Sequence, residues 1–407
     1  MAAAQVAFLI AGSLLAVVPW KRLPGWAGPA VLAAAAVLVR VIAFSDVRTA
    51  TDDLSGAVLF LLLAVPLAVL LDRSGFFTAL ASMVDGGRHL KSGLWMLAAL
   101  VTIVFNLDAA VVLLTPLSVR IADRHGEDPV TLAFIPVLQA ALASSVLPVS
   151  NLTNLIVADR FGLGAGDFVA HLGLPSLASI AVGGIVFVRM TSGHVAPAAG
   201  PTAPTEVTPT EPTAPGEHRK ALITGTIVVA WLLVGFIVGE RIGVPAWIVA
   251  AVALTGLMIH QRTLPWRQIP VHAAVLAAGL GVLATAAAVH LPVGRLLSIR
   301  GIPGELAAIS AVALGANAIN NLPAVLVTLP ALDQHHERVW AVLLGANLGP
   351  TLWITGALST LLWQSTLRRL GHTVTALRYA RTAVRVGIPA MLAAAGAHAL
   401  VVLVARL

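Results

Sequence analysis

The sequence contains no cysteine, one tyrosine and few charged residues. Only 11% of its 407 residues are charged and 5% are aromatic, whereas 58% are hydrophobic. The absence of cysteine excludes disulfide bonds, thiolate metal sites and a cysteine nucleophile. Soluble domains carry about 25% charged residues. The low charge and the mean hydropathy of +0.93 therefore indicate a polytopic, all-α membrane protein.

Several further function classes are disfavoured by the same composition. The formal net charge of +7 is better explained by basic cytoplasmic loops than by a nucleic-acid partner. The twelve histidines show no metal-ligand spacing, so no metal site or resident cofactor is expected, and His398 is interpreted as interfacial. A P-loop is also missing, so any ATPase has to be a separate subunit.

Composition divides the chain into two transmembrane repeats, residues 1–190 and 221–407, joined by a disordered linker over 191–220 that is rich in Pro and Thr. A spanning helix needs about 20 apolar residues. About ten spans are expected, eight of them uninterrupted: 4–20, 26–44, 54–72, 168–190, 221–239, 244–260, 268–290 and 384–405. A polar loop is expected over 45–53, and interfacial helices over 74–90 and 293–300.

Four apolar stretches are too interrupted for single spans. Residues 92–122 and 304–334 are predicted to be re-entrant hairpins, and residues 130–160 and 338–365 broken helices. The hairpin tips match at an offset of 214, with Asn106 opposite Asn320 and Pro116 opposite Pro330. Irregular backbone at mid-membrane persists only where it lines a cavity or is buried in protein. This pattern predicts inverted repeats, the plan of many secondary transporters.

Basic residues give the expected orientation in the plasma membrane. With both termini outside and the linker in the cytoplasm, 17 Lys and Arg residues fall inside and 8 fall outside, Arg338 among the latter. This asymmetry agrees with the positive-inside rule. The first hairpin then enters from the cytoplasm and the second from outside.

Asp108 is the strongest candidate for a functional residue. A carboxylate at mid-bilayer is unfavourable by roughly 2.5–3.5 kcal/mol on insertion scales and is normally functional, and a proton is its simplest ligand. The alternative is an acid that caps a helix or reaches the interface. The candidate solute-binding residues, which have helix capping as their alternative role, are Asn106, Ser150, Asn151, Thr153, Asn154, Asn320, Asn321, Thr355, Ser359 and Thr360.

Four motifs resemble the arsenical-pump membrane protein family (ArsB-type) of the ion transporter superfamily. Residues 106–116 are similar to the family's Asn-Asp-Gly-Ala-Ala…Leu-Thr-Pro, and residues 150–164 match most closely. Asn320-Asn321-Leu322-Pro323 and Leu348-Gly349-Pro350 complete the resemblance, which covers nearly the whole chain. The chain departs from the family where Asn347 replaces a usual Asp and Thr351 a usual Lys.

The resemblance implies a transporter and not an enzyme. Its expected substrate is arsenite or antimonite, exported as the neutral trihydroxide in exchange for protons, with the proton gradient as the energy source. Alternatives are a sodium/proton antiporter or organic-anion carrier of the superfamily, and the membrane subunit of an ATP-driven pump. A homodimer in the lipid bilayer is a further expectation.

Overall fold

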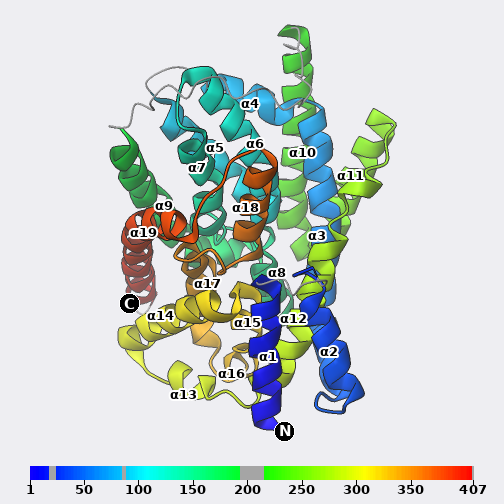
Figure 1. The fold of residues 1–407 in the computed structure, drawn as a ribbon, viewed down its shortest axis with the longest axis vertical. Helices are drawn as coiled ribbons and strands as arrows, with labels where there is room; N and C mark the ends of the chain where they lie inside the picture. The colour runs from blue at the N-terminus through cyan, green and yellow to red at the C-terminus, as the bar shows by residue number, and fades with distance from the viewer. Residues whose placement is uncertain (18–23, 85–88, 193–214, 406–407) are drawn as a thin grey trace.

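The computed structural model describes residues 1–17, 24–84, 89–192 and 215–405, which form helices and no β-strand (Figure 1). The all-helical prediction is confirmed. Six helices of the described residues are long and apolar enough to cross a membrane. They are α3 (Phe44–Arg73), α9 (Ala165–Thr191), α10 (Pro215–Arg241), α12 (Val271–Ala288), α14 (Gly301–Ile319) and α19 (Ala376–Val404).

One group of helices, here called the scaffold, packs around α3 and α12. It also contains α1 (Ala2–Val17), α2 (Gly28–Leu38), α10 and α11 (Ala246–Gln261). Small residues allow close backbone approach: a Cβ on Gly279 of α12 would lie 2.4 Å from the amide nitrogen of Ala30 in α2. Such close packing is typical of helices in membranes, where the hydrophobic effect does not drive association.

The remaining long helices form a second group, here called the hairpin bundle. Its interrupted elements are α5 (Leu90–Phe105) with α6 (Leu107–His125), α7 (Pro129–Leu142) with α8 (Leu152–Phe161), α14 with α15 (Asn321–Leu326) and α16 (Leu329–Leu332), and α17 (Val339–Leu348) with α18 (Leu358–Arg369). The last helices of the two repeats, α9 and α19, pack along each other and join the halves. The short helices α4 (Phe76–Val84) and α13 (Val293–Leu297) lie where interfacial helices were expected.

Two expected boundaries are wrong. Residues 45–53 are not a loop, because α3 begins at Phe44, and Asp46 Oδ2 caps it by accepting a hydrogen bond from the Ala43 amide at 3.2 Å. The expected span 26–44 is also wrong, since α2 ends at Leu38 and Arg40 adopts a positive φ of 58°. Its 11 residues extend over about 16 Å, roughly half of the hydrocarbon thickness.

The expected linker over 191–220 mostly lies outside the described residues, which omit 193–214. At its margins, α9 includes Thr191 and α10 begins at Pro215, so the helical part of each repeat extends further than the composition indicated.

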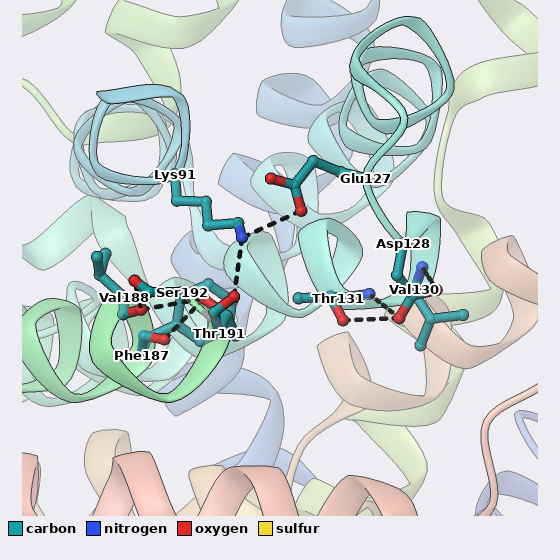
Figure 2. A network of polar contacts seen from close by, with 9 residues as sticks. All are labelled: Lys91, Glu127, Asp128, Val130, Thr131, Phe187, Val188, Thr191 and Ser192. Carbon is teal, nitrogen blue, oxygen red and sulfur yellow. Dashed lines mark hydrogen bonds and ion pairs between the residues drawn. The ribbon is translucent and has the colours of Figure 1, made fainter. Parts of the chain in front are cut away.

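An ion pair closes the open end of the first hairpin. Lys91 at the start of α5 lies 3.0 Å from Glu127, which follows α6, and it also donates to the Thr191 carbonyl of α9 at 3.1 Å (Figure 2). Beside it, Asp128 caps α7 by accepting hydrogen bonds from the amides of Val130 and Thr131. One lysine therefore joins both arms of the hairpin to the last helix of the repeat.

A buried ion cluster closes the open end of the second hairpin. Arg338 donates to the Glu305 carboxylate and to the carbonyls of Leu297, Ile299 and Gly301. The other oxygen of Glu305 lies 3.1 Å from Nε2 of His398 in α19. The prediction of an interfacial His398 is wrong, because only 1% of this residue is exposed. Arg338, expected in an outer loop, is 3% exposed.

The two hairpins approach the centre of the molecule from opposite ends. Figure 1 shows α4 and the open end of α5 and α6 at the top, and α13 and α16 at the bottom. Both chain termini lie in the lower half, whereas the ends of α9 and α10 that flank residues 193–214 lie towards the top. This arrangement is that of two inverted repeats.

The Glu305 cluster provides a test of this fold. Glu305→Gln leaves the buried Arg338 charge without its counter-ion, and such a loss destabilises a protein by roughly 3–5 kcal/mol. We expect a clearly lower melting temperature of the purified carrier in detergent. The control is Glu337→Gln, because this carboxylate is 61% exposed beside His335. Equal melting temperatures for the two variants would contradict a stabilising role of the cluster.

Candidate functional site

The hairpin tips and helix breaks meet at one cavity between the hairpin bundle and the scaffold. The first repeat contributes residues 107–108 and 151–153, and the second contributes residues 320–322 and 357–358. The opposite wall comes from α12, through four apolar side chains, and from Leu61 of α3. The four irregular stretches therefore converge on a mostly apolar cavity with a few polar groups, the usual character of a small-molecule site.

The two tip asparagines have the same local structure. Asn106 has φ 118° and ψ 150°, and Asn320 has φ 80° and ψ 153°. Each side chain accepts a hydrogen bond from the amide two residues ahead, Asp108 at 2.6 Å and Leu322 at 3.2 Å. These bonds pair a free amide at the start of the return helix. Helix capping thus accounts for both tip side-chain oxygens.

The polar residues of the first helix break also bond to backbone. Asn151 Oδ1 accepts from the Thr153 amide at 3.3 Å, and Asn154 donates to the carbonyls of Ser144 and Leu147 across the break. Ser150 donates to a carbonyl of α5, that of Ile103, at 2.8 Å. Since backbone groups at this depth have no water to bond, these side chains hold the break in place.

Asp108 lies on the cavity wall in the first turn of α6, with 9% of its surface exposed. Its Oδ1 is buried and accepts no hydrogen bond from any residue that the structure describes. The N-terminus of a helix favours a negative charge nearby. The carboxylate is therefore positioned to bind a proton or a polar solute.

The cavity brings together only part of the predicted site. Asp108, Asn151, Thr153, Asn320 and Asn321 line it. The other predicted side chains lie elsewhere in the bundle: Asn106, Ser150, Asn154, Thr355, Ser359 and Thr360. Within the described ranges, no group of three or more His, Cys, Asp or Glu residues is arranged to hold a metal ion.

Two features of the site were not among the predicted site residues, although Asn347 had been noted as a departure from the family pattern. Asn347, 1% exposed, bonds to the polar residues of the first break from the end of α17. The sequence feature that could have revealed Asn347 is a single amide side chain in an otherwise apolar stretch. The apolar wall from α12 had no such feature, because its Ala and Leu residues resemble those that face lipid.

The strain at the first tip gives a second test. Asn106 occupies a region of backbone angles that is essentially restricted to glycine and is unfavourable by roughly 1–3 kcal/mol for other residues. Asn106→Ala keeps this strain and loses the cap, which is worth roughly 0.5–2 kcal/mol. Asn106→Gly loses the cap but relieves the strain.

Melting curves of the two purified variants should therefore place Asn106→Gly above Asn106→Ala. The reverse order would show that the tip does not adopt this conformation in the folded carrier.

Comparisons with known proteins agree with this architecture. A family model described as "Citrate transporter" matches residues 5–359. Proteins named "Arsenical pump membrane protein" are 29% identical in Escherichia coli and 28% identical in Yersinia enterocolitica, with 92% of this chain and 93% of each relative covered. The resemblance drawn from the motifs is thereby confirmed.

The fold is also similar to that of a solved transporter. The crystal structure of the Alcanivorax borkumensis YdaH transporter, reported to have an unusual topology, aligns with a TM-score of 0.55 and 15% identity. The alignment covers 86% of this chain and 87% of that chain.

Proposed function

Since this chain belongs to the citrate transporter family and is a multi-pass membrane transporter, we propose that it exports trivalent arsenic or antimony in exchange for protons. One observation carries the proposal: among the described residues, Asp108 is the single acid on a cavity whose other polar side chains are neutral. No Lys, Arg or His side chain lines the cavity in the part of the chain that the structure describes. The name of the relatives supports the choice of cargo.

A neutral trihydroxide suits these groups. Its hydroxyls can donate to Asp108 and bond with Asn321 and Thr153, all on the cavity wall. A di- or tricarboxylate needs cationic or well-aligned donor groups, and charge-assisted pairs are the strongest of such contacts. The chain has no cysteine to bind arsenic through sulfur. Recognition through hydroxyl groups also permits release, which a carrier requires.

Exchange follows from competition for one carboxylate. Ionised Asp108 accepts a hydrogen bond from a hydroxyl of the solute, whereas protonated Asp108 has lost one acceptor position and its charge. A proton from outside therefore displaces the solute there. Release of that proton to the cytoplasm restores the ionised form for the next solute. The proton gradient thus drives export without another cofactor.

The cavity also supports a route for movement. It lies between the hairpin bundle and a largely apolar scaffold wall. We propose that the hairpin bundle moves as a unit past α3 and α12, so that the cavity opens to each side of the membrane in turn. The two re-entrant hairpins would then act as the inner and outer covers of the site.

A sodium-coupled carrier is the second candidate. Its support is the pair of buried oxygens, Asp108 Oδ1 and Thr153 Oγ1, that have no hydrogen-bond partner among the described residues. Sodium prefers oxygen ligands of this kind. In that case flux would follow a sodium gradient and not a proton gradient.

The central test uses everted membrane vesicles with an acidic lumen. Wild-type vesicles should accumulate arsenite without ATP, and Asp108→Asn should reduce accumulation to the level of vesicles that lack the carrier. The amide still accepts a hydrogen bond but cannot exchange a proton, so downhill arsenite exchange should persist. The control is Asp123→Asn, an exposed acid near the far end of the same helix.

Three outcomes separate the alternatives. Proton-driven accumulation in Asp108→Asn would remove this residue from the coupling mechanism. Accumulation that follows an imposed sodium gradient would favour the second candidate. A strict requirement for ATP and a separate protein would indicate the membrane subunit of an ATP-driven pump.

The proposed plasma-membrane orientation can be tested by cysteine labelling. The chain has no cysteine of its own, so each introduced cysteine is the only one that can react. Single cysteines replace Thr208 in the central linker and Ser45, which is exposed near the start of α3. In intact cells a membrane-impermeant maleimide should label Ser45→Cys only, and in everted vesicles Thr208→Cys only. The opposite pattern would reverse the orientation and the direction assigned to the hairpins.

A further inference from the structure

Asn347 connects the two repeats beside the cavity. It lies at the C-terminal end of α17 and is 1% exposed. Its Oδ1 accepts hydrogen bonds from Asn151 Nδ2 and from Ser144 Oγ, the latter at 3.3 Å. Its Nδ2 donates to Asn154 Oδ1 at 2.7 Å. One side chain of the second repeat thus bonds three side chains of the first helix break.

The neighbouring bonds determine which group Asn347 presents on each side. Asn154 uses its Nδ2 to donate to the carbonyls of Ser144 and Leu147, so only its oxygen faces Asn347. A donor is therefore required there. Asn151 uses its Oδ1 for the Thr153 amide, so its Nδ2 faces Asn347 and requires an acceptor. A neutral amide satisfies both requirements, whereas a carboxylate would place an oxygen against the Asn154 oxygen.

Asn347 acts on the cavity through its neighbour. Asn151 lines the cavity, but Asn347 does not. We propose that Asn347 is a positioning residue, which fixes the Asn151 side chain towards the solute and joins the two broken helices. A group at this position must both donate and accept a hydrogen bond without charge. The transport assay for this inference rests on the proposed function.

Asn347→Asp distinguishes positioning from simple packing. When protonated, the new acid accepts from Asn151 and donates to Asn154, as the amide does. When ionised, it loses the donor. We expect a KM for arsenite near the wild-type value at acidic pH and about ten-fold higher at alkaline pH. Asn347→Ser, which adds no ionisable group, should raise KM equally at all pH values.

The ratio of variant to wild-type KM removes the contributions of other titrating groups. The side chains that bond Asn347 are neutral, and Asp108 titrates in both proteins. The titratable or charged groups on helices packed against α17, which are also common to both proteins, are Asp159, Arg160, Asp167, His171, Arg189, Glu305, His336, Glu337, Arg338, Arg378, Tyr379, Arg381, Arg385 and His398. A pH-independent KM ratio, or a loss of Vmax with unchanged KM, would overturn the proposal.

A second measurement does not depend on arsenite. Folded Asn347→Asp protein should hold its proton more tightly than the unfolded chain, because Asn154 faces it with an acceptor. Its melting temperature should therefore fall relative to wild type as pH rises. If wild type does not transport arsenite, the proposed function fails. The pH dependence of the melting-temperature difference between Asn347→Asp and wild type still tests the hydrogen-bond assignment. A difference that is constant with pH would overturn that assignment.

Discussion

The structure depends on how backbone groups are paired where helices stop inside the apolar bundle. In a membrane, an unpaired amide or carbonyl has no water to bond, so each interruption needs its own partner. The same contact pairs a backbone amide at three of the interruptions. In each, an asparagine side-chain oxygen accepts a hydrogen bond from the amide two residues ahead, and these asparagines are Asn106, Asn151 and Asn320. The fourth interruption has no such side chain, and there the Gly356 carbonyl accepts from the Asn321 amide at 2.9 Å. The second tip and the second break therefore stabilise each other.

Because the asparagines are used for capping, the site has few free polar groups. The two repeats also contribute different polar residues. Most of the predicted polar residues bond to backbone, so the carboxylate of Asp108 is the main uncommitted group on the cavity. Its counterpart in the second repeat is Leu322. Conversely, Asn347 of the second repeat lies opposite Ala141 at the offset of 206 that relates the two breaks. Each repeat supplies a polar group that the other lacks, so the site needs both.

The sequence predicted those features that local pattern encodes. An amide within an apolar run predicted both tips, since such a residue is unfavourable in a membrane helix unless it has a structural role. The prediction of a polar loop over 45–53 was wrong, because caps and ion pairs can extend a helix beyond its apolar part. The cluster of Glu305, Arg338 and His398 was not predicted, although Glu305 is the only acid in the apolar segment 301–319. Its members lie 33 and 93 positions apart, and local periodicity does not report such pairings.

The distribution of ion pairs indicates which parts of the molecule can move relative to one another at the lowest energetic cost. Within the hairpin bundle, the Glu305 cluster is almost fully buried, and breaking such a pair is unfavourable by several kcal/mol. Between bundle and scaffold, Arg160 of α8 pairs with Asp53 of α3 at 2.9 Å, and within the bundle it also pairs with Asp333, which follows α16, at 2.7 Å. These groups are 14–46% exposed, so water can replace the lost contacts, and the net contribution of each pair is about 0–1 kcal/mol. Because the cavity lies on this boundary, movement of the intact bundle along the scaffold disturbs fewer strong interactions than opening of the second hairpin, which the buried Glu305 cluster closes.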